Sequence, residues 1–168
     1  RSYLAWLCAE RGEFAEAIAC GKEGVDIAEA GHHAYTQSYT SWGLGMPYVV
    51  RGDLVEAARV LEKADSLCRE WNLPLISALV SGALGIVRAR SGRGAEGVAL
   101  LREAVASHER TFGHGVWHSQ NLIWLGEALM LSSQFDEAQT FGEQALAHAR
   151  EGRHRVSEPW ALHLLGEV

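Results

Sequence analysis

One local pattern recurs four times in this chain at a nearly constant spacing. Each copy is a short turn segment followed by a Glu, and the copies span residues 11–17, 51–57, 91–97 and 132–138. Their anchor positions, 12, 52, 92 and 133, lie 40, 40 and 41 residues apart. A period of this length is typical of stacked structural units, because each unit buries its apolar face only against its neighbours. The pattern therefore predicts a repeat array rather than one globular core.

Each copy opens an amphipathic helix. Residues 135–149 place apolar side chains at helical spacings with polar ones between them, and the other copies repeat this arrangement. A more apolar helix precedes each copy, at about 35–51, 75–91 and 116–132. Period-two alternation is absent, so we expect an all-α chain of helical hairpins. The units are predicted at about 1–33, 34–73, 74–114 and 115–154, with a partial unit at 155–168.

Composition limits the function classes. Hydrophobic residues make up 48% of the chain and charged residues 21%, which is typical of a folded protein. A net charge of −6 offers no basic surface for nucleic acid, and no apolar run reaches the length of a membrane span. The three cysteines, Cys8, Cys20 and Cys68, lie at apolar helix positions and are expected to be reduced thiols of a cytoplasmic protein. The first residue, Arg1, and an end within a repeat suggest a piece of a longer protein.

Motifs for chemistry are weak. Gly92 to Gly97 match a dinucleotide fingerprint by letter, but they follow a helix instead of a strand and occupy repeat columns. His114 and His118 are four residues apart, yet no carboxylate or cysteine completes a metal site beside them. We therefore expect solvated histidines here and at His108, His148, His154 and His163. The sequence predicts no catalytic residue, no metal, no cofactor and no enzyme activity.

Residues at further equivalent positions of the repeats resemble the pattern of a known family. Leu44-Gly45, Tyr48 and the later Ala57, Leu61 and Ala64 resemble the tetratricopeptide repeat, and Leu-Gly recurs at 84–85, 125–126 and 165–166. The resemblance implies a right-handed superhelical solenoid of antiparallel helix pairs, here with units of about 40 residues. The small residues of these columns are expected to allow close helix packing, so that Ala138→Leu would overpack the core. More narrowly, the chain resembles the carboxy-terminal repeats of bacterial signalling proteins that join a cyclase-like output domain to a P-loop ATPase.

The resemblance also implies a binding surface. In tetratricopeptide repeats the first helix of each unit lines a concave groove, at positions set by the Leu-Gly column. Carried over to this sequence, these positions, with an aromatic residue one turn earlier, are Trp6, Tyr39, Trp42, Met46, Val49, Ile86, Arg90, Ile123, Glu127, Met130, Trp160 and His163. The same rule adds Glu10, Val50, Gly82, Ala89, Leu131 and Glu167, while Trp71, Trp117 and Trp124 are expected in the core.

The predicted function is a regulatory protein-binding scaffold of a bacterial signalling protein. Its apolar, aromatic groove suits a peptide, an amphipathic helix or a neighbouring domain of the same chain. Two alternatives stay open at this point. One is a small-molecule effector domain that controls a linked ATPase or cyclase, and the other is a homodimerisation module that uses the open ends of the solenoid.

Overall fold

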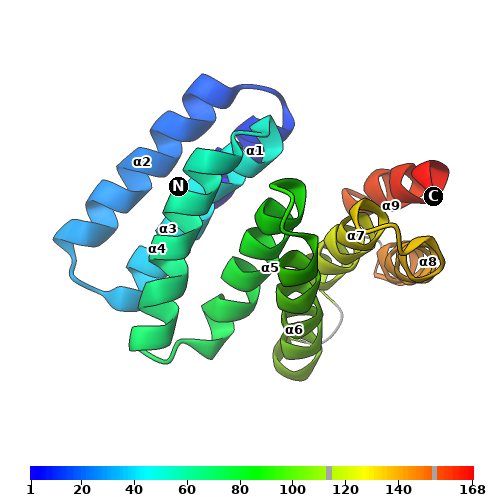
Figure 1. The fold of residues 1–168 in the computed structure, drawn as a ribbon. Coiled ribbons are helices and arrows are strands. Elements are labelled where there is room, and N and C mark those ends of the chain that lie inside the picture. Colours follow the sequence, from blue (N-terminus) through cyan, green and yellow to red (C-terminus); the bar gives the residue numbers. More distant parts are fainter. Residues whose placement is uncertain (113–114, 153–154) are drawn as a thin grey trace.

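The computed structural model describes residues 1–112, 115–152 and 155–168, and these form nine α-helices without a β-strand (Figure 1). The prediction of an all-α solenoid of antiparallel helix pairs is confirmed. The expected helices at 35–51, 75–91, 116–132 and 135–149 agree with the observed ones to within two residues at either end. The unit boundaries placed at 114 and 154 lie outside the described residues. The helices are α1 (Ser2–Glu10), α2 (Phe14–Ala30), α3 (Ala34–Arg51), α4 (Leu54–Glu70), α5 (Pro74–Arg90), α6 (Gly94–Phe112), α7 (Val116–Leu131), α8 (Phe135–Glu151) and α9 (Ser157–Glu167).

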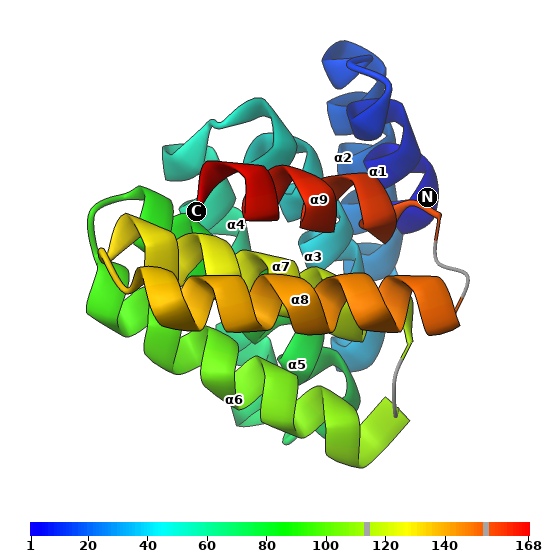
Figure 2. The ribbon, with the colours of Figure 1, turned by 90° about the vertical axis from the view of Figure 1, so that its right-hand side faces the viewer.

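The helices form two layers. The first helices of successive pairs pack on one another, α1 on α3, α3 on α5, α5 on α7 and α7 on α9. In the part of the chain that the structure describes, the second helices α2, α4, α6 and α8 do not approach one another within 8 Å between Cα atoms. Because the first helices lie closer together than the second, the stack curves, with the first helices on its inner side. Figures 1 and 2 show the pairs following one another from blue to red.

The recurring turn is a Schellman motif that ends the first helix of each pair. In the four copies a 2.9 Å hydrogen bond runs from a backbone N–H to the carbonyl five residues earlier, from Glu13 to Cys8 and at the equivalent places Asp53 to Tyr48, Arg93 to Arg88 and Gln134 to Leu129. The residue just before the N–H donor of this bond has a positive φ. The angle is near +80° at Gly12, Gly52 and Gly92 and 58° at Ser133. Glycine adopts this conformation without strain, which explains the repeated column.

Small residues inside the helices serve close packing. A Cβ on Gly97 would lie 2.6 Å from the Gly85 carbonyl oxygen and 2.8 Å from the Ala89 backbone nitrogen, so α5 and α6 meet backbone to backbone. A Cβ on Gly85 would lie 2.7 Å from Leu101 Cγ. Ala138, in the column of Gly97, is completely buried. The expectation that this column allows close helix approach is consistent with these contacts.

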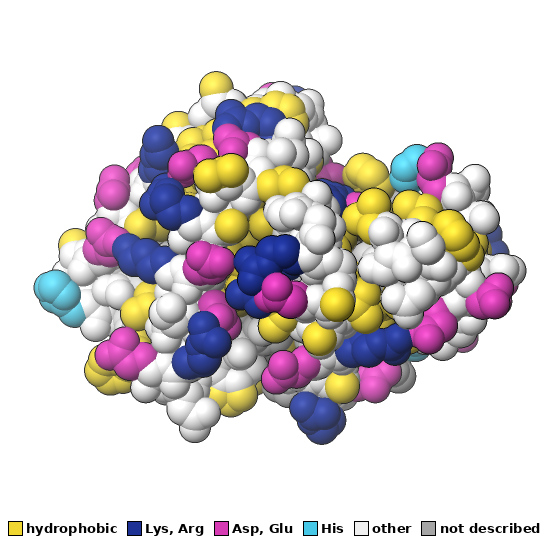
Figure 3. All heavy atoms as spheres, in the orientation of Figure 1, with side chains coloured by type: hydrophobic (Ala, Val, Ile, Leu, Met, Phe, Trp, Pro, Cys, Tyr) yellow, Lys and Arg dark blue, Asp and Glu magenta, His cyan; other side chains and the backbone are white. Residues whose placement is uncertain are grey.

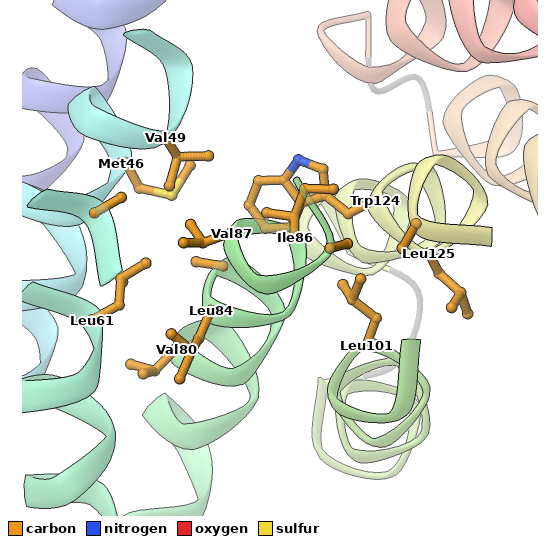
Figure 4. Packing of buried hydrophobic residues seen from close by; sticks show 14 of the residues in the cluster. Met46, Val49, Leu61, Val80, Leu84, Ile86, Val87, Leu101, Trp124 and Leu125 are labelled. Carbon is orange, nitrogen blue, oxygen red and sulfur yellow. The ribbon is translucent and has the colours of Figure 1, made fainter. Parts of the chain in front are cut away.

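Most of the buried hydrophobic side chains form one seam along the stack, and Cys8, Ala9 and Ala17 form a second, small cluster. Met46, Val49 and Leu61 face Val80, Leu84 and Val87 of α5, and the seam continues through Leu101 to Trp124 and Leu125 (Figure 4). Burial by neighbouring hairpins, rather than within one, is what the 40-residue period requires.

Three side chains depart from the sequence prediction. Trp71, expected in the core, is 59% exposed because it is the C-cap residue of α4, in the turn that leads to α5. His108 and His118, expected to be solvated, are 2% and 0% exposed, because α6, α7 and α8 pack around them. Their rings lie 6.4 Å apart, and the His148 ring lies 5.0 Å from that of His118. His114 and His154 lie outside the described residues.

The surface carries charges of both signs. On the face shown in Figure 3, Lys and Arg side chains alternate with Asp and Glu. Many of them pair, as in the Lys63 to Glu29 ion pair of 2.6 Å between neighbouring units. None of the helices described here has both the length and the apolar character needed to cross a bilayer.

Candidate functional site

The inner side of the stack holds a cavity of about 270 Å³. The side chains that line it come from the first helices alone, because these form the inner layer. Met46, Val49 and Val50 of α3 and Ile123, Trp124 and Met130 of α7 make its apolar walls. Helices α1 and α9, from the first and last units, both contribute, so the curvature brings together segments far apart in the sequence. The remaining lining residues are Trp6, Glu10, Arg90, Gln120, Glu127, Leu131, Trp160, His163, Leu164 and Glu167.

Charged groups form part of the lining. Arg90 Nε donates to Glu127 Oε1 at 2.6 Å, Nη2 donates to Oε2 at 2.9 Å, and Nη1 donates to the Val49 carbonyl at 3.3 Å. The three contacts join α3, α5 and α7 at the cavity wall. Trp6 Nε1 donates to Glu10 Oε1 at 2.9 Å. Partial burial raises the pKa of Glu10, and the Trp6 hydrogen bond offsets part of that rise.

A cluster of aromatic rings connects the first unit to the fourth. Trp117, at the start of α7, lies 4.9 Å from Trp6 and 4.8 Å from Trp42 between ring centroids, and its Nε1 donates to the Tyr3 hydroxyl at 3.4 Å. Tyr39 stacks on Trp42 at 5.5 Å. Burial, followed by the hydrogen bond with Tyr3, raises the pKa of Tyr39, so its hydroxyl stays protonated. Helix α1 and helix α7 are therefore held together across the inner side by ring contacts.

Most of the residues predicted for the groove come together in this cavity. Those lining it are Trp6, Met46, Val49, Arg90, Ile123, Glu127, Met130, Trp160 and His163. Ile86 and Trp42 do not line the cavity. They are 0% and 1% exposed and belong to the core. Tyr39 is half-buried in the aromatic cluster. Of the other positions selected by the same rule, Glu10, Val50, Leu131 and Glu167 line the cavity, whereas Gly82 and Ala89 are buried away from it.

Three lining residues were not predicted there. Trp124 was expected in the core, and at 6% exposure it is both a core residue and part of the cavity wall. Gln120 lies one turn before Ile123, and Leu164 follows His163. Continuing the helical period from Ile123 back by one turn would have found Gln120, whereas no sequence signal separates the two roles of Trp124.

One cluster in the described chain has metal-ligand chemistry. The sulfur of Cys8 and carboxylate oxygens of Glu13 and Glu16 lie within 4.8 Å of one another. Burial, followed by the charges of Glu16 and Glu13, raises the pKa of the Cys8 thiol. A protonated thiol is a poor metal ligand, so this cluster offers a weak site. Cys8, Cys20 and Cys68 are free thiols, as the sequence predicted.

Comparison with known proteins defines the family. The tetratricopeptide repeat profile matches residues 75–151, and a second profile of the same description matches residues 1–20, so that more than half of the chain is matched. The chain belongs to the tetratricopeptide repeat family. Tetratricopeptide repeats generally mediate protein–protein interactions, through concave surfaces of this kind, and are typically non-catalytic scaffolds.

Solved structures agree on the fold. Two crystal structures of a Podosopora anserina putative kinesin light chain with nearly identical TPR-like repeats match at TM-scores of 0.70 and 0.69, with 20% identity, over 98% of this chain and 81% of that one. The structure of BtubC (BKLC) from P. vanneervenii matches at 0.71, with 18% identity, over 98% of this chain and 71% of that one. The sequence matches no curated protein significantly.

Proposed function

We propose that this tetratricopeptide chain holds an apolar peptide or helix of a partner protein, or of a neighbouring domain, in the cavity on its inner side. The single observation that carries this proposal is the cavity itself, in which apolar side chains from α1, α3, α7 and α9 converge on one space. The apolar side chains of Leu131 and Trp160 in its lining are 52% and 46% exposed, which is costly in water, and a partner's apolar side chains would remove that cost.

The cavity, at about 270 Å³, is large enough to hold a few side chains of a peptide. It lies at the lower limit of the roughly 300–1,000 Å³ that is usual for small-ligand pockets. A few anchoring side chains on one face of a helix would fill it while the rest of the helix stays on the surface. We therefore propose neither the small-molecule sensor nor the homodimer.

The biological setting follows from the sequence resemblance. A protein-binding region of a bacterial signalling protein in the cytoplasm would hold its target here and thereby bias an ATPase or cyclase domain linked to it. Binding that favours one state of such a linked domain is the simplest form of this regulation, since a ligand shifts an equilibrium only by its differential affinity for the two states.

Selection from a library of random 15-residue peptides tests the proposal. Met130 lies half-buried in the cavity wall, so Met130→Trp adds a neutral, bulky side chain that fills the cavity. Val55, on the outer helix α4, is 78% exposed, and Val55→Trp is the matched control. We expect wild type and Val55→Trp to enrich the same peptides and Met130→Trp to lose them, with circular dichroism unchanged. Equal enrichment by all three, or no enrichment by wild type, would refute the peptide site.

A further inference from the structure

The charges around the cavity do not balance. Among the described residues, the charged groups of its lining are three carboxylates, Glu10, Glu127 and Glu167, and one guanidinium, Arg90. These four groups leave two negative charges in excess, and His163 lies beside them in the lining. A charged residue in a concave, apolar setting acts on a ligand more strongly than one on a flat surface, because low-dielectric walls focus its field.

The guanidinium is not available to an acidic ligand. Arg90 uses Nε and Nη2 on the Glu127 carboxylate and Nη1 on the Val49 carbonyl. An arginine with its donors committed in a two-point pair is satisfied, so an incoming carboxylate would have to break that pair. The pair also consumes the charge of Glu127, which leaves Glu10 and Glu167 as the carboxylates that face an incoming group.

Indole rings accompany these carboxylates. Trp6, Trp124 and Trp160 line the same cavity, and Trp160 is 46% exposed. Aromatic faces attract guanidinium and ammonium groups, and they also accept the aliphatic stems of Arg and Lys side chains. Carboxylates at the rim and indoles in the wall together suit one long cationic side chain.

We propose that the cavity selects a peptide segment whose anchoring residue is Arg or Lys within an apolar stretch. The stem of that residue packs on the indole rings, and its charged end reaches Glu10 and Glu167. This inference rests on the proposed function, since it names the class of peptide that the same cavity takes. It excludes acidic segments, whose carboxylates would meet the two negative charges of Glu10 and Glu167 while the described lining arginine, Arg90, is already paired.

Two display libraries of equal size test the selectivity, one with a fixed central Arg and one with a fixed central Glu among random neighbours. We expect wild type to enrich the Arg library about tenfold over the Glu library, with a smaller ratio at high salt because exposed charges are screened. The double variant Glu10→Gln, Glu167→Gln removes both charges with little change of volume and should bring the ratio close to one. Its control is Glu62→Gln, Glu70→Gln, two exposed carboxylates of the outer helix α4, which should keep the wild-type ratio.

The outcomes separate the inference from the proposed function. Equal enrichment of both libraries, lost in Met130→Trp, would overturn the cationic selectivity and leave the peptide site intact. A wild-type ratio that persists in the Glu10, Glu167 double variant would also overturn it. Enrichment of neither library would overturn both the selectivity and the site.

Discussion

Arg90 on α5 and Glu127 on α7 form a two-point ion pair, 2.6 Å and 2.9 Å between their donor and acceptor atoms, on the wall of the inner cavity. The sequence placed both residues among the groups that contact a ligand. In the structure they contact each other, and the pair joins the third unit to the fourth. Their side chains are 31% and 25% exposed, so the pair is partly shielded from water.

A double-mutant cycle measures the strength of this pair. Arg90→Met keeps most of the aliphatic stem, and Glu127→Gln keeps the shape of the side chain. We expect a coupling free energy of about 1 kcal/mol, at the upper end for partly exposed pairs, because the geometry is two-pronged. Urea unfolding of the wild type, both single variants and the double variant gives this value. Additive effects of the two substitutions would show that the pair contributes nothing to stability.

The fourth copy of the turn carries avoidable strain. Ser133 has a φ of 58°, in the position where Gly12, Gly52 and Gly92 stand. A non-glycine residue in this region costs about 1–2 kcal/mol, part of which is offset because glycine makes the unfolded chain more flexible. We expect Ser133→Gly to raise the free energy of unfolding by about 0.5–1 kcal/mol. The reverse change, Gly92→Ser, should lower it, and a loss of stability in Ser133→Gly would contradict the turn geometry.

Replacing Gly97 by Ala, the residue found at the equivalent positions of the other repeats, should destabilise the protein. Ala17, Ala57 and Ala138 stand at the equivalent positions, yet a Cβ on Gly97 would meet backbone atoms of Gly85 and Ala89 at 2.6 Å and 2.8 Å. We expect Gly97→Ala to lower the free energy of unfolding by about 1–3 kcal/mol.

The control for this substitution is a glycine without close neighbours. At Gly166 no atom lies within 4 Å of the Cβ position, and there Ala should be neutral or stabilising. Thermal melts that rank the two variants in the opposite order would show that α5 and α6 do not meet as closely as described.

Acidification should destabilise the contact between the third and fourth units. Burial lowers the pKa of His108 from its ordinary value of 6.5. The unfolded chain therefore binds this proton more readily than the folded one, and the contribution to stability is present above pH 6.5 and is lost as pH falls toward the folded pKa. Among the described residues, the titratable groups nearby include His118, His148 and Glu109, whose carboxylate lies 3.7 Å from His118 Nε2.

Replacement of His108 isolates its share of this pH dependence. We expect the free energy of unfolding of wild type to fall between pH 7 and pH 5 by more than that of His108→Gln, because glutamine does not titrate. Parallel curves for the two proteins over this range would contradict a neutral, buried His108.

Much of the fold could be predicted from the sequence. The 40-residue period, the turn glycines and the Leu-Gly column placed the four helices at 35–51, 75–91, 116–132 and 135–149 to within two residues. Each of these signals reports local backbone geometry or the contact between the helices of one pair. Met46 and Glu127, each one residue after its Leu-Gly glycine, line the cavity, whereas Ile86 at the same place in the third unit is buried in the core.

The rest depends on how the units stack, which local patterns do not encode. Trp42, three residues before its Leu-Gly glycine, is buried because Trp117 of the fourth unit packs on it at 4.8 Å. Ile123, at the equivalent place in the fourth unit, is 5% exposed and lines the cavity. The curvature of the whole stack decides between these environments. Trp42→Ala would therefore probe the core, and variants at Met130, Glu10 and Glu167 are the ones that probe the cavity.

The indole N–H signals in a heteronuclear NMR titration report where on the stack a peptide binds. Trp6, Trp124 and Trp160 line the cavity, and Trp71 is exposed in the turn between α4 and α5 as an internal control. On addition of an enriched Arg-centred peptide, we expect the signals of Trp6, Trp124 and Trp160 to shift while that of Trp71 stays in place. A shift confined to Trp71, or no shift in the three cavity indoles while the peptide binds, would show that the inner cavity is not where partners are held.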